Sequence, residues 1–294
     1  MNGLQTRPAR FALKGADGTS INLHAETAGA PDDPLVILLH GFPEFWYGWR
    51  GQIGPLARSG YFVVAPDQRG YNLSDKPRGY KHYQLDKLTG DIMGIMDHYG
   101  REKAIIAGHD WGAAVAWHLA IHHPERVERL AILNVPHPGA MARALRKPLP
   151  GQLGRSWYVG FFQIPLLPEL MLSAGRHSGL RRMMRVSSKP GTFSKDDLRR
   201  YREAWKQRGA LTAMLNWYRA ALRSGGGYTS TERVSVPTLI LWGEQDIALI
   251  PELAHWSLEF CDQGKLVLFP EASHWIQHEQ SERVTARLLE FWGD

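Results

Sequence analysis

The sequence has 294 residues, of which 44% are hydrophobic and 22% are charged, and its formal net charge is +6. These proportions and this length are typical of a globular protein with a large core, and they argue against a disordered chain. The single cysteine, Cys261, excludes an intramolecular disulfide and a cysteine-based metal cluster, and it indicates a reducing compartment. No run approaches the roughly 18 apolar residues of a membrane span, and no signal peptide is evident. We therefore expect a cytoplasmic protein.

Apolar patterns predict the elements in chain order. Residues near Arg10–Glu26 alternate around a turn at Ala16–Thr19, which indicates an antiparallel hairpin. Helical patterns follow further along the chain, most clearly at Tyr83–Tyr99 and Ser281–Phe291. Strands that alternate with helices predict an α/β fold with a mostly parallel, doubly wound sheet flanked by helices. The run Leu35–Leu39 is continuously apolar, so it predicts a strand buried on both faces. The other runs that predict strands are Tyr61–Ala65, Arg129–Val135, Val236–Trp242 and Lys265–Phe269.

One further apolar run, Ala104–Ala107, leads into Gly108-His109-Asp110-Trp111-Gly112 and then into a helical pattern. This is the spacing of a nucleophile elbow, with aspartate where serine hydrolases carry serine. Glycines at both flanks suit a tight, strained turn, and the start of the following helix favours a carboxylate. A capping aspartate after a buried strand has the same local pattern, so the rest of the chain must separate the two interpretations.

After the strand predicted at Arg129–Val135, the alternation of strands and helices stops. No strand-like run of comparable quality appears for about a hundred residues, and this segment ends in the flexible Gly225–Gly227. We therefore expect residues 137–233 to form an inserted helical cap. The α/β core would then consist of residues 1–136 and 234–294.

The excess positive charge concentrates between Arg176 and Arg208. The acidic residues Asp196, Asp197 and Glu203 are interspersed there, and no nucleic-acid-binding motif accompanies the arginines. A solvated helical face is therefore the favoured interpretation. We expect neither a nucleic-acid partner nor a membrane partner.

Two polar loops follow the last two predicted strands, at the edge where open α/β sheets bind ligands. Asp246 lies in the first loop and His274 in the second, so with Asp110 they stand in the nucleophile–acid–histidine order of the α/β-hydrolases. Three suitable residues at strand ends in this order are rarely accidental. Glu244 competes with Asp246 as the weaker candidate acid. Asn134, at the end of the preceding strand, cannot carry a charge.

Motifs along essentially the whole chain resemble those of the epoxide hydrolase branch of the α/β-hydrolase family. In the expected cap, Tyr158–Gln163 and Asn216–Arg219 resemble the stretches that carry the family's paired tyrosines, which hold the epoxide oxygen. The motif set is specific as a group. In the core, the matching motifs are His40-Gly41-Phe42-Pro43 in the oxyanion loop, Gly108–Gly112 at the nucleophile, Arg69-Gly70-Tyr71 through Ser74-Asp75-Lys76-Pro77 after the third strand, and His274-Trp275 followed by Gln277 and Glu279.

The resemblance implies a set of site residues and partners. Asp110 would be the nucleophile, His274 and Asp246 would activate water, and Tyr158 and Tyr218 would hold the epoxide oxygen. The substrate would be a small apolar epoxide together with water, with no cofactor and no metal, and the protein would be a monomer or a homodimer. The oxyanion hole would be formed by the backbone N–H groups of Phe42 and Trp111. Substrate-binding residues would be Trp111, Phe42, Pro43, Trp217 and Trp275.

The chemistry of an aspartate nucleophile agrees with this interpretation. An aspartate ionises near pH ~3.9, so Asp110 is nucleophilic at neutral pH without an activating base. Its attack on an acyl ester would give an anhydride that collapses back, which argues against esterase or peptidase activity. Displacement at an sp3 carbon instead gives an alkyl-enzyme ester. Water activated by His274 can then hydrolyse that ester.

Haloalkane and haloacid dehalogenases use the same kind of nucleophile and are the main alternative. Haloalkane dehalogenases also carry tryptophan after the nucleophile, as at Trp111, but they commonly have asparagine where Phe42 stands. Haloacetate dehalogenases use arginine at the position of Trp111. Both departures favour the epoxide hydrolase interpretation. A non-catalytic small-molecule-binding protein on the same fold is the remote alternative.

Overall fold

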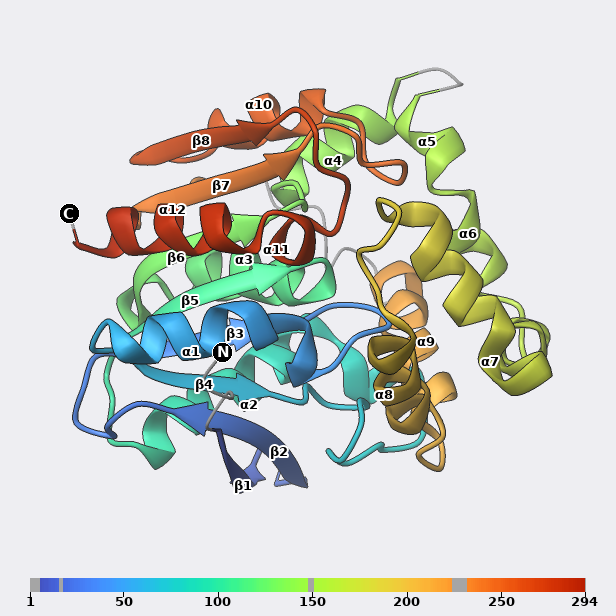
Figure 1. Cartoon of the computed structure of the whole chain (residues 1–294), viewed down its shortest axis with the longest axis horizontal. Helices are drawn as coiled ribbons and strands as arrows, with labels where there is room; N and C mark the ends of the chain where they lie inside the picture. Colours follow the sequence, from blue (N-terminus) through green and yellow to red (C-terminus); the bar gives the residue numbers. More distant parts are fainter. Residues whose placement is uncertain (1–5, 16–17, 148–150, 224–231, 294) are drawn as a thin grey trace.

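The computed structural model describes residues 6–15, 18–147, 151–223 and 232–293, and its centre is an eight-stranded sheet (Figure 1). The strand order is β1-β2-β4-β3-β5-β6-β7-β8. β2 runs antiparallel to β1 and β4, whereas all pairs from β4 to β8 are parallel. This confirms the predicted mostly parallel α/β sheet. The strands are β1 (Arg7–Lys14), β2 (Ser20–Ala28), β3 (Leu35–Leu39), β4 (Phe62–Pro66), β5 (Ala104–His109), β6 (Val127–Leu133), β7 (Thr238–Gly243) and β8 (Gly264–Phe269).

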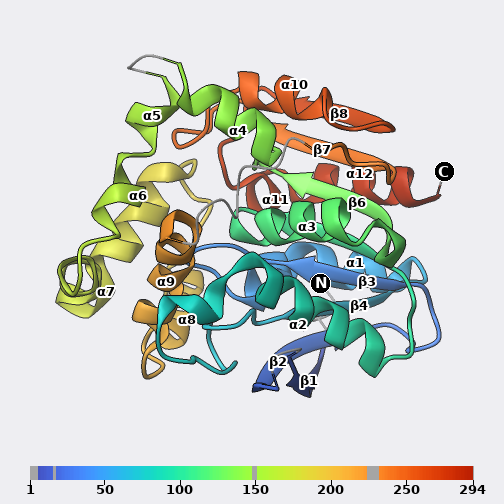
Figure 2. The ribbon, with the colours of Figure 1, turned by 180° about the vertical axis from the view of Figure 1, so that it is seen from behind.

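Alternate side chains of the strands supply two hydrophobic cores, one on each face of the sheet. On β3, Val36 and Leu38 pack in the core formed with α1 and α12, whereas Ile37 and Leu39 pack in the core formed with α2 and α3. Figures 1 and 2 show these two pairs of helices on opposite faces of the sheet. The helices of the core are η1 (Trp46–Trp49), α1 (Arg50–Arg58), η2 (Tyr80–Tyr83), α2 (Leu85–His98), α3 (Trp111–His122), η3 (Pro124–Arg126), α10 (Glu252–Leu258), α11 (Ile276–Glu279) and α12 (Ser281–Gly293).

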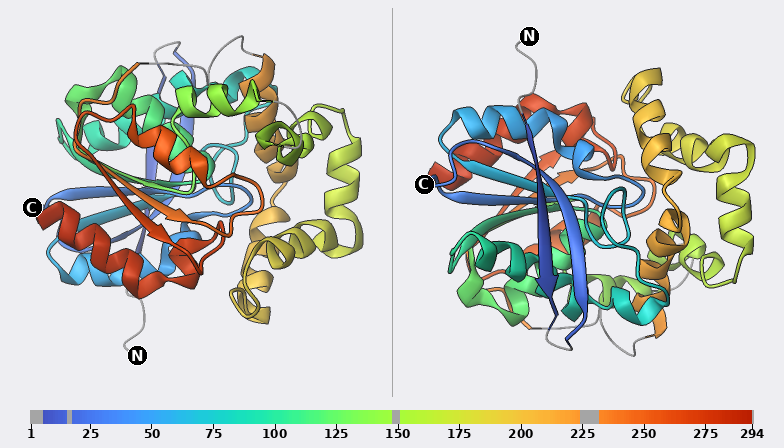
Figure 3. Two further views of the ribbon diagram at one scale, coloured as in Figure 1. Left: turned by 90° about the horizontal axis from the view of Figure 1, so that it is seen from above. Right: turned by 90° about the horizontal axis from the view of Figure 1, so that it is seen from below.

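The chain between β6 and β7 contains helices and no strand among its described residues. Figures 1 and 3 show α5 to α9 grouped beyond the carboxyl ends of the parallel strands, and we call these five helices the helical layer. The predicted flexible stretch Gly225–Gly227 lies outside the described residues, as does part of the turn at Ala16–Thr19. The helices are α4 (Pro138–Leu145), α5 (Gln152–Arg155), α6 (Trp157–Phe161), α7 (Leu167–Ser187), α8 (Lys195–Trp205) and α9 (Ala210–Arg223).

α7 consists of two helical pieces rather than one. Its backbone leaves the helical conformation at Ala174, and the next three residues, Gly175, Arg176 and His177, all have positive φ. Left-handed backbone in two non-glycine residues breaks the run of helical hydrogen bonds. The arginine-rich stretch that the sequence predicts as a helical face therefore begins in a kink.

Other differences from the predicted elements are confined to element ends. The helix expected from Tyr83 begins at Leu85, because Tyr83 closes η2 and its hydroxyl donates to the carbonyl of Pro77 at 2.8 Å. The strand expected from Arg129 begins two residues earlier, at Val127. Neither difference moves a candidate site residue to another element.

Candidate active site

Asp110 stands between β5 and α3 in a strained backbone conformation, with φ 50° and ψ −126°. The turn is closed in on both sides. A Cβ on Gly108 would lie 2.5 Å from the carbonyl oxygen of Gly112, and one on Gly112 would lie 2.2 Å from that of Leu39. Glycine is therefore required at both flanks. The strain is held by the packed strand and helix, which fix the Asp110 carboxylate at the carboxyl edge of the sheet.

The imidazole of His274 lies between two carboxylates. Its Nδ1 is 2.6 Å from Oδ2 of Asp246, and its Nε2 is 3.6 Å from Oδ2 of Asp110. The acid that contacts the ring is thus Asp246 rather than Glu244. The structure brings together the three residues that the sequence places after three different strands, and both His274 and Asp246 are buried.

Asp246 is fixed by hydrogen bonds to both of its carboxylate oxygens. Oδ1 accepts from the backbone N–H groups of Ala248 and Leu249, at 2.8 and 3.0 Å, and Oδ2 accepts from the Asn134 amide at 2.9 Å. The Asn134 side-chain oxygen in turn accepts from the N–H of Gly243 at 2.8 Å. Asn134 cannot be the acid of the triad, but it orients that acid. Its position at a strand end was the signal for this role.

Opposing effects set the protonation state of the site. Burial favours the neutral form of His274, but the charges of Asp246 and Asp110 outweigh it and raise the pKa of His274 to about 10. Burial likewise opposes ionisation of the two carboxyls, yet their interactions with His274 keep the pKa of each below its ordinary value. At neutral pH the site therefore holds an imidazolium between two carboxylates. Within the described ranges, no group of three or more His, Cys, Asp and Glu side chains is arranged to hold a metal ion.

A backbone donor approaches the Asp110 carboxylate from the loop after β3. The N–H of Phe42 donates to Oδ1 of Asp110 at 2.6 Å. This approach depends on Gly41, where a Cβ would lie 2.2 Å from the Cβ of Asp110. Trp111 is the first residue of α3, so its N–H has no partner within the helix. The two residues predicted for the oxyanion hole thus flank Asp110, one from the loop and one from the helix.

Tyr158 on α6 and Tyr218 on α9 come together on the other side of the site. Their ring centroids are 6.0 Å apart, and the Tyr218 ring meets those of Trp111 and Phe42 edge-on at 5.0 and 5.3 Å. Burial raises the pKa of both phenols, and the charge of Asp110 raises it further. Both phenols are therefore protonated donors that lie within the field of the Asp110 carboxylate.

A buried carboxylate to which the sequence analysis gives no role lies behind this constellation. Glu44, which directly follows the His40–Pro43 motif, accepts a hydrogen bond from the Tyr201 hydroxyl of α8 at 2.5 Å and one from the Gln277 amide at 3.1 Å. It also pairs with Nε2 of His278 at 2.7 Å. Burial opposes its ionisation, but its hydrogen bond and electrostatic interaction with His278 hold the pKa of Glu44 well below its usual range. An acid directly after the oxyanion motif was the only sequence signal.

His109, the residue before Asp110, connects this carboxylate to the loop that carries His274. Its Nε2 donates to the backbone carbonyl of His274 at 2.9 Å, and its Nδ1 accepts from the Gln277 amide at 3.0 Å. The same Nδ1 lies 3.4 Å from Glu44. The nucleophile elbow, the oxyanion loop and the histidine loop are therefore joined by one buried polar network.

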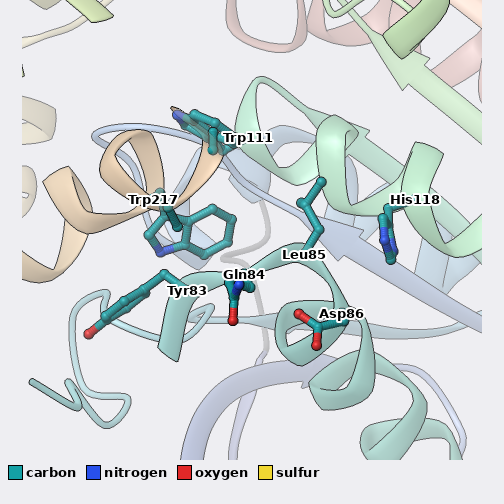
Figure 4. Close-up of a pocket in the computed structure, with 9 residues that line it drawn as sticks. Tyr83, Gln84, Leu85, Asp86, Trp111, His118 and Trp217 are labelled. Carbon is teal, nitrogen blue, oxygen red and sulfur yellow. The ribbon is translucent and has the colours of Figure 1, made fainter. Parts of the chain in front are cut away.

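A pocket of about 220 Å³ opens beside the nucleophile elbow (Figure 4). Trp111 and Trp217 form part of its wall, and the Trp217 indole is fixed by donating to the carbonyl of Arg69 at 3.0 Å. None of the predicted catalytic residues lines this pocket. The lining residues are Tyr83, Gln84, Leu85, Asp86, Trp111, His118, Trp217, Ala220 and Ala221.

Two other predicted substrate-binding residues instead contact the helical layer. The carbonyl of Pro43 accepts from the Trp205 indole of α8 at 2.6 Å. Trp275 is buried beside His274, and its indole donates to the Ser187 hydroxyl of α7 at 2.9 Å. Neither residue lines the pocket of Figure 4. Their contacts help to hold the helical layer on the core.

Comparison with known sequences gives a consistent set of relatives. A family model described as alpha/beta hydrolase fold matches residues 34–281. The AB hydrolase superfamily protein YfhM of Bacillus subtilis is 48% identical over 271 residues, which cover 92% of this chain and 94% of that protein. Epoxide hydrolase 1 of Caenorhabditis elegans is 37% identical over 276 residues, which cover 92% of this chain and 68% of that protein.

The similarity extends to three dimensions. A crystal structure of a mutant epoxide hydrolase from Bacillus megaterium, bound to its diol product, matches with a TM-score of 0.87 at 32% sequence identity. The match covers 97% of this chain and 100% of that chain. It therefore includes the helical layer as well as the sheet.

Proposed function

The chain belongs to the α/β-hydrolase family, in the branch that contains epoxide hydrolases, and from this premise we propose that it converts epoxides to vicinal diols. The observation that carries the proposal is the pair of protonated phenols, on Tyr158 and Tyr218, in the field of the Asp110 carboxylate. An epoxide oxygen gains negative charge as its ring opens. A carboxylate nucleophile and two neutral donors suit that reaction, because the donors bind the transition state more strongly than the ground state.

In the first step, a carboxylate oxygen of Asp110 attacks a ring carbon. The new ester bond forms as the carbon–oxygen bond of the ring breaks, and the departing oxygen takes a proton from Tyr158 or Tyr218. The imidazolium of His274 returns a proton to the phenolate. This step leaves a hydroxyalkyl ester on Asp110, two neutral phenols and a neutral imidazole.

In the second step, His274 acts as the base. Esterification removes the charge of Asp110, one of the two charges that hold the pKa of His274 high. Nε2 then takes a proton from water, whose oxygen attacks the ester carbonyl. The N–H groups of Phe42 and Trp111 stabilise the oxyanion, each by about 3 kcal/mol.

Collapse of this intermediate gives the diol and restores the resting site. The diol leaves with an original oxygen of Asp110 and takes the proton from His274. The carboxyl group keeps the oxygen that came from water and returns its own proton to His274. The site is then again an imidazolium between two carboxylates, ready for a second epoxide.

We assign residues 137–233 as a cap on an α/β core made of residues 1–136 and 234–294. The cap supplies both phenols, through α6 and α9, and the core supplies the nucleophile, the acid and the base. The aromatic rings of Trp111 and Trp217, whose centroids lie 6.0 Å apart, favour a small apolar epoxide. Phe42, Pro43 and Trp275 complete the proposed substrate-binding set.

The proposal is tested with epoxides and haloalkanes of matched carbon skeletons, with diol and halide release measured in parallel. We expect diol formation to be the faster reaction for every pair. The double variant Tyr158→Phe, Tyr218→Phe should lose diol formation without gaining halide release, because the phenols serve only the epoxide oxygen. Faster halide release by the unmodified protein across the matched pairs would assign it to the dehalogenases instead.

A further inference from the structure

The outer edge of the helical layer exposes apolar side chains to solvent. Trp157, Leu166 and Leu170 are 69, 71 and 66% exposed. In the first half of α7, Leu167, Leu170 and Met171 stand at helix positions i, i+3 and i+4, so they form one apolar stripe. A surface helix normally buries such a stripe, whereas all three of these residues are exposed. Figures 1 and 3 show α6 and α7 at the end of the molecule opposite the C-terminus.

The helical layer also carries more than the whole excess of positive charge. Residues 151–223 contain 14 Lys and Arg against four Asp and Glu, a net charge of +10. The complete chain has 35 Lys and Arg and 29 Asp and Glu, so the remaining residues have 21 and 25 and a net charge of −4. The molecule is therefore strongly polarised, and its basic side is the side with the exposed apolar stripe.

Several of these basic side chains are free to meet an external anion. Arg176, Arg182 and Arg185 are exposed, and none of them forms an ion pair with a described acidic residue. In the second half of α7, Arg182, Arg185 and Val186 share one exposed face at positions i, i+3 and i+4. The first piece of α7 thus exposes apolar groups, and the second piece exposes arginines together with Val186.

From this pairing we infer that the outer surface of α6 and α7 docks on an anionic membrane surface. Trp and Leu side chains at the headgroup boundary, with arginines among the lipid phosphates, are the chemistry of interfacial helices. Within the described ranges, no helix is long and apolar enough to cross a membrane. The expectation of no membrane partner rested on the lack of a spanning run, which a surface contact does not require.

A second copy of the chain fits this surface less well. A two-fold contact brings the same surface of both subunits together, so a layer of charge +10 would face another of charge +10. An anionic lipid surface is attractive to both the apolar stripe and the arginines. Tyr158 is next to Trp157 on α6, so docking would also bring Tyr158 towards the lipid bilayer, in which apolar epoxides dissolve. This consequence rests on the proposed function.

Vesicle co-sedimentation of the full chain tests the inference without reference to activity. Vesicles of equal parts phosphatidylglycerol and phosphatidylcholine should bind the protein at least about tenfold more tightly than vesicles of phosphatidylcholine alone. Binding should weaken in about 0.5 M salt, because salt screens the arginines. Equal binding to both vesicle types, or to neither, would overturn the inference.

Matched variants separate this surface from general attraction between a basic protein and anionic lipid. The triple variant Trp157→Ser, Leu166→Ser, Leu170→Ser and the double variant Arg182→Glu, Arg185→Glu should each lose binding by about tenfold or more. The double variant Arg283→Glu, Arg287→Glu changes the net charge equally on exposed positions of α12 and should keep most of it. Leu73→Ser, at an exposed loop position, is the control for the apolar changes.

Circular dichroism and thermal midpoints show whether each variant is folded, so that only folded variants are compared. Equal losses from the two charge-reversal pairs would reduce the effect to net charge and overturn the inference. Sedimentation velocity supplies a further decisive result. A dimer that the triple serine variant abolishes, in a protein that does not bind vesicles, would assign the surface to a second copy of the chain.

Discussion

The sheet side and the helical side of the candidate site hold their residues in different ways. Asp110, Asp246 and His274 each follow a parallel strand, and buried hydrogen bonds fix the groups around them. On the helical side, Tyr218 is buried in the 14-residue helix α9, whereas Tyr158 stands on the five-residue helix α6, none of whose residues is fully buried. Asp110 and His274 are therefore more firmly preorganised than the two phenols, and Tyr218 is the better fixed of the two tyrosines.

The difference shows how the two sides depend on each other. A strand end places a side chain through the hydrogen-bond ladder of the sheet, whereas a cap residue is placed only as well as its helix is docked. Docking here combines an apolar cluster shared with the core and buried polar contacts, such as those of Tyr201 with Glu44 and of Trp205 with the carbonyl of Pro43. Variants can therefore remove a side chain on the sheet side, remove a phenol on the helical side, or weaken the buried contacts that join the two sides.

The largest effect on turnover is expected from removing His274, the sheet-side residue that the second step of the proposed reaction needs. His274→Ala should lower turnover by about 10⁴-fold or more, because no base remains to activate water. Esterification of Asp110 should continue, so a stoichiometric mass increase should accumulate on the peptide that carries it. Mass spectrometry measures this directly, and His255→Ala, at an exposed position of α10, is the control. Substrate binding without any adduct would contradict the division of labour.

Removing the phenol hydroxyls on the helical side should have the next largest effect on the reaction rate. Loss of one preorganised donor costs about 10²–10³-fold in rate, so Tyr158→Phe and Tyr218→Phe should each slow the esterification of Asp110 by this factor. The better fixed Tyr218 should show the greater loss, and the double variant should be nearly inactive. Phenylalanine keeps the ring packing, and Tyr61→Phe removes a phenol outside the site. Wild-type diol formation by the double variant, with chemistry rate-limiting, would make both tyrosines packing residues.

The variant Glu44→Gln tests the buried polar contacts that join the two sides. An amide cannot accept all the hydrogen bonds that Glu44 receives, so we expect a loss of about 1–3 kcal/mol in the free energy of unfolding. The pKa of Glu44 is depressed in the folded state, so its stabilisation is present above the ordinary value of 4.5 and is lost as pH falls through the folded pKa. Urea unfolding at neutral and acidic pH measures the difference.

This stability difference should therefore shrink on acidification. Glu282→Gln, on the exposed face of α12, is the matched control and should leave stability unchanged at every pH. Equal unfolding free energies for Glu44→Gln and the unmodified protein at neutral pH would show that the buried network does not join the two sides.

The smallest expected effect is a shift in the pKa of His274. The pKa of His274, raised to about 10, should fall in Asp246→Asn and by a smaller amount in Asp110→Asn, in the order of the two charges that raise it. NMR of ring-labelled histidine measures it. The charged ring stabilises the fold fully below its ordinary pKa of 6.5, and this contribution is lost as pH rises through about 10. An unchanged titration in Asp246→Asn would contradict the arrangement of charges.

The parts of the molecule that depend on local rules were predictable from the sequence. The continuous apolar runs predicted the parallel sheet, and the Gly108–Gly112 spacing predicted the turn at Asp110. The positions of Asp246 and His274 after successive strands predicted that they would meet Asp110, because parallel strands end at one edge.

The remaining parts depend on docking, which no local pattern encodes. Tyr158 and Tyr218 came from a family resemblance, since nothing in the periodicity of α6 or α9 distinguishes a donor from a packing residue. The buried role of Glu44 needed the positions of α8 and α11. The kink in α7 places left-handed backbone at Arg176, which a helical pattern does not predict.

The central claim is that Asp110 forms a covalent ester, and one turnover in oxygen-18 water tests it most directly. With enzyme in excess, the oxygen that enters the first diol should come from the Asp110 carboxylate, so that diol should contain no label. Mass spectrometry of the Asp110 peptide should find the label in its carboxyl group, and later turnovers should release it into product. Label in the first diol with none in Asp110 would mean direct attack by water and would contradict the account.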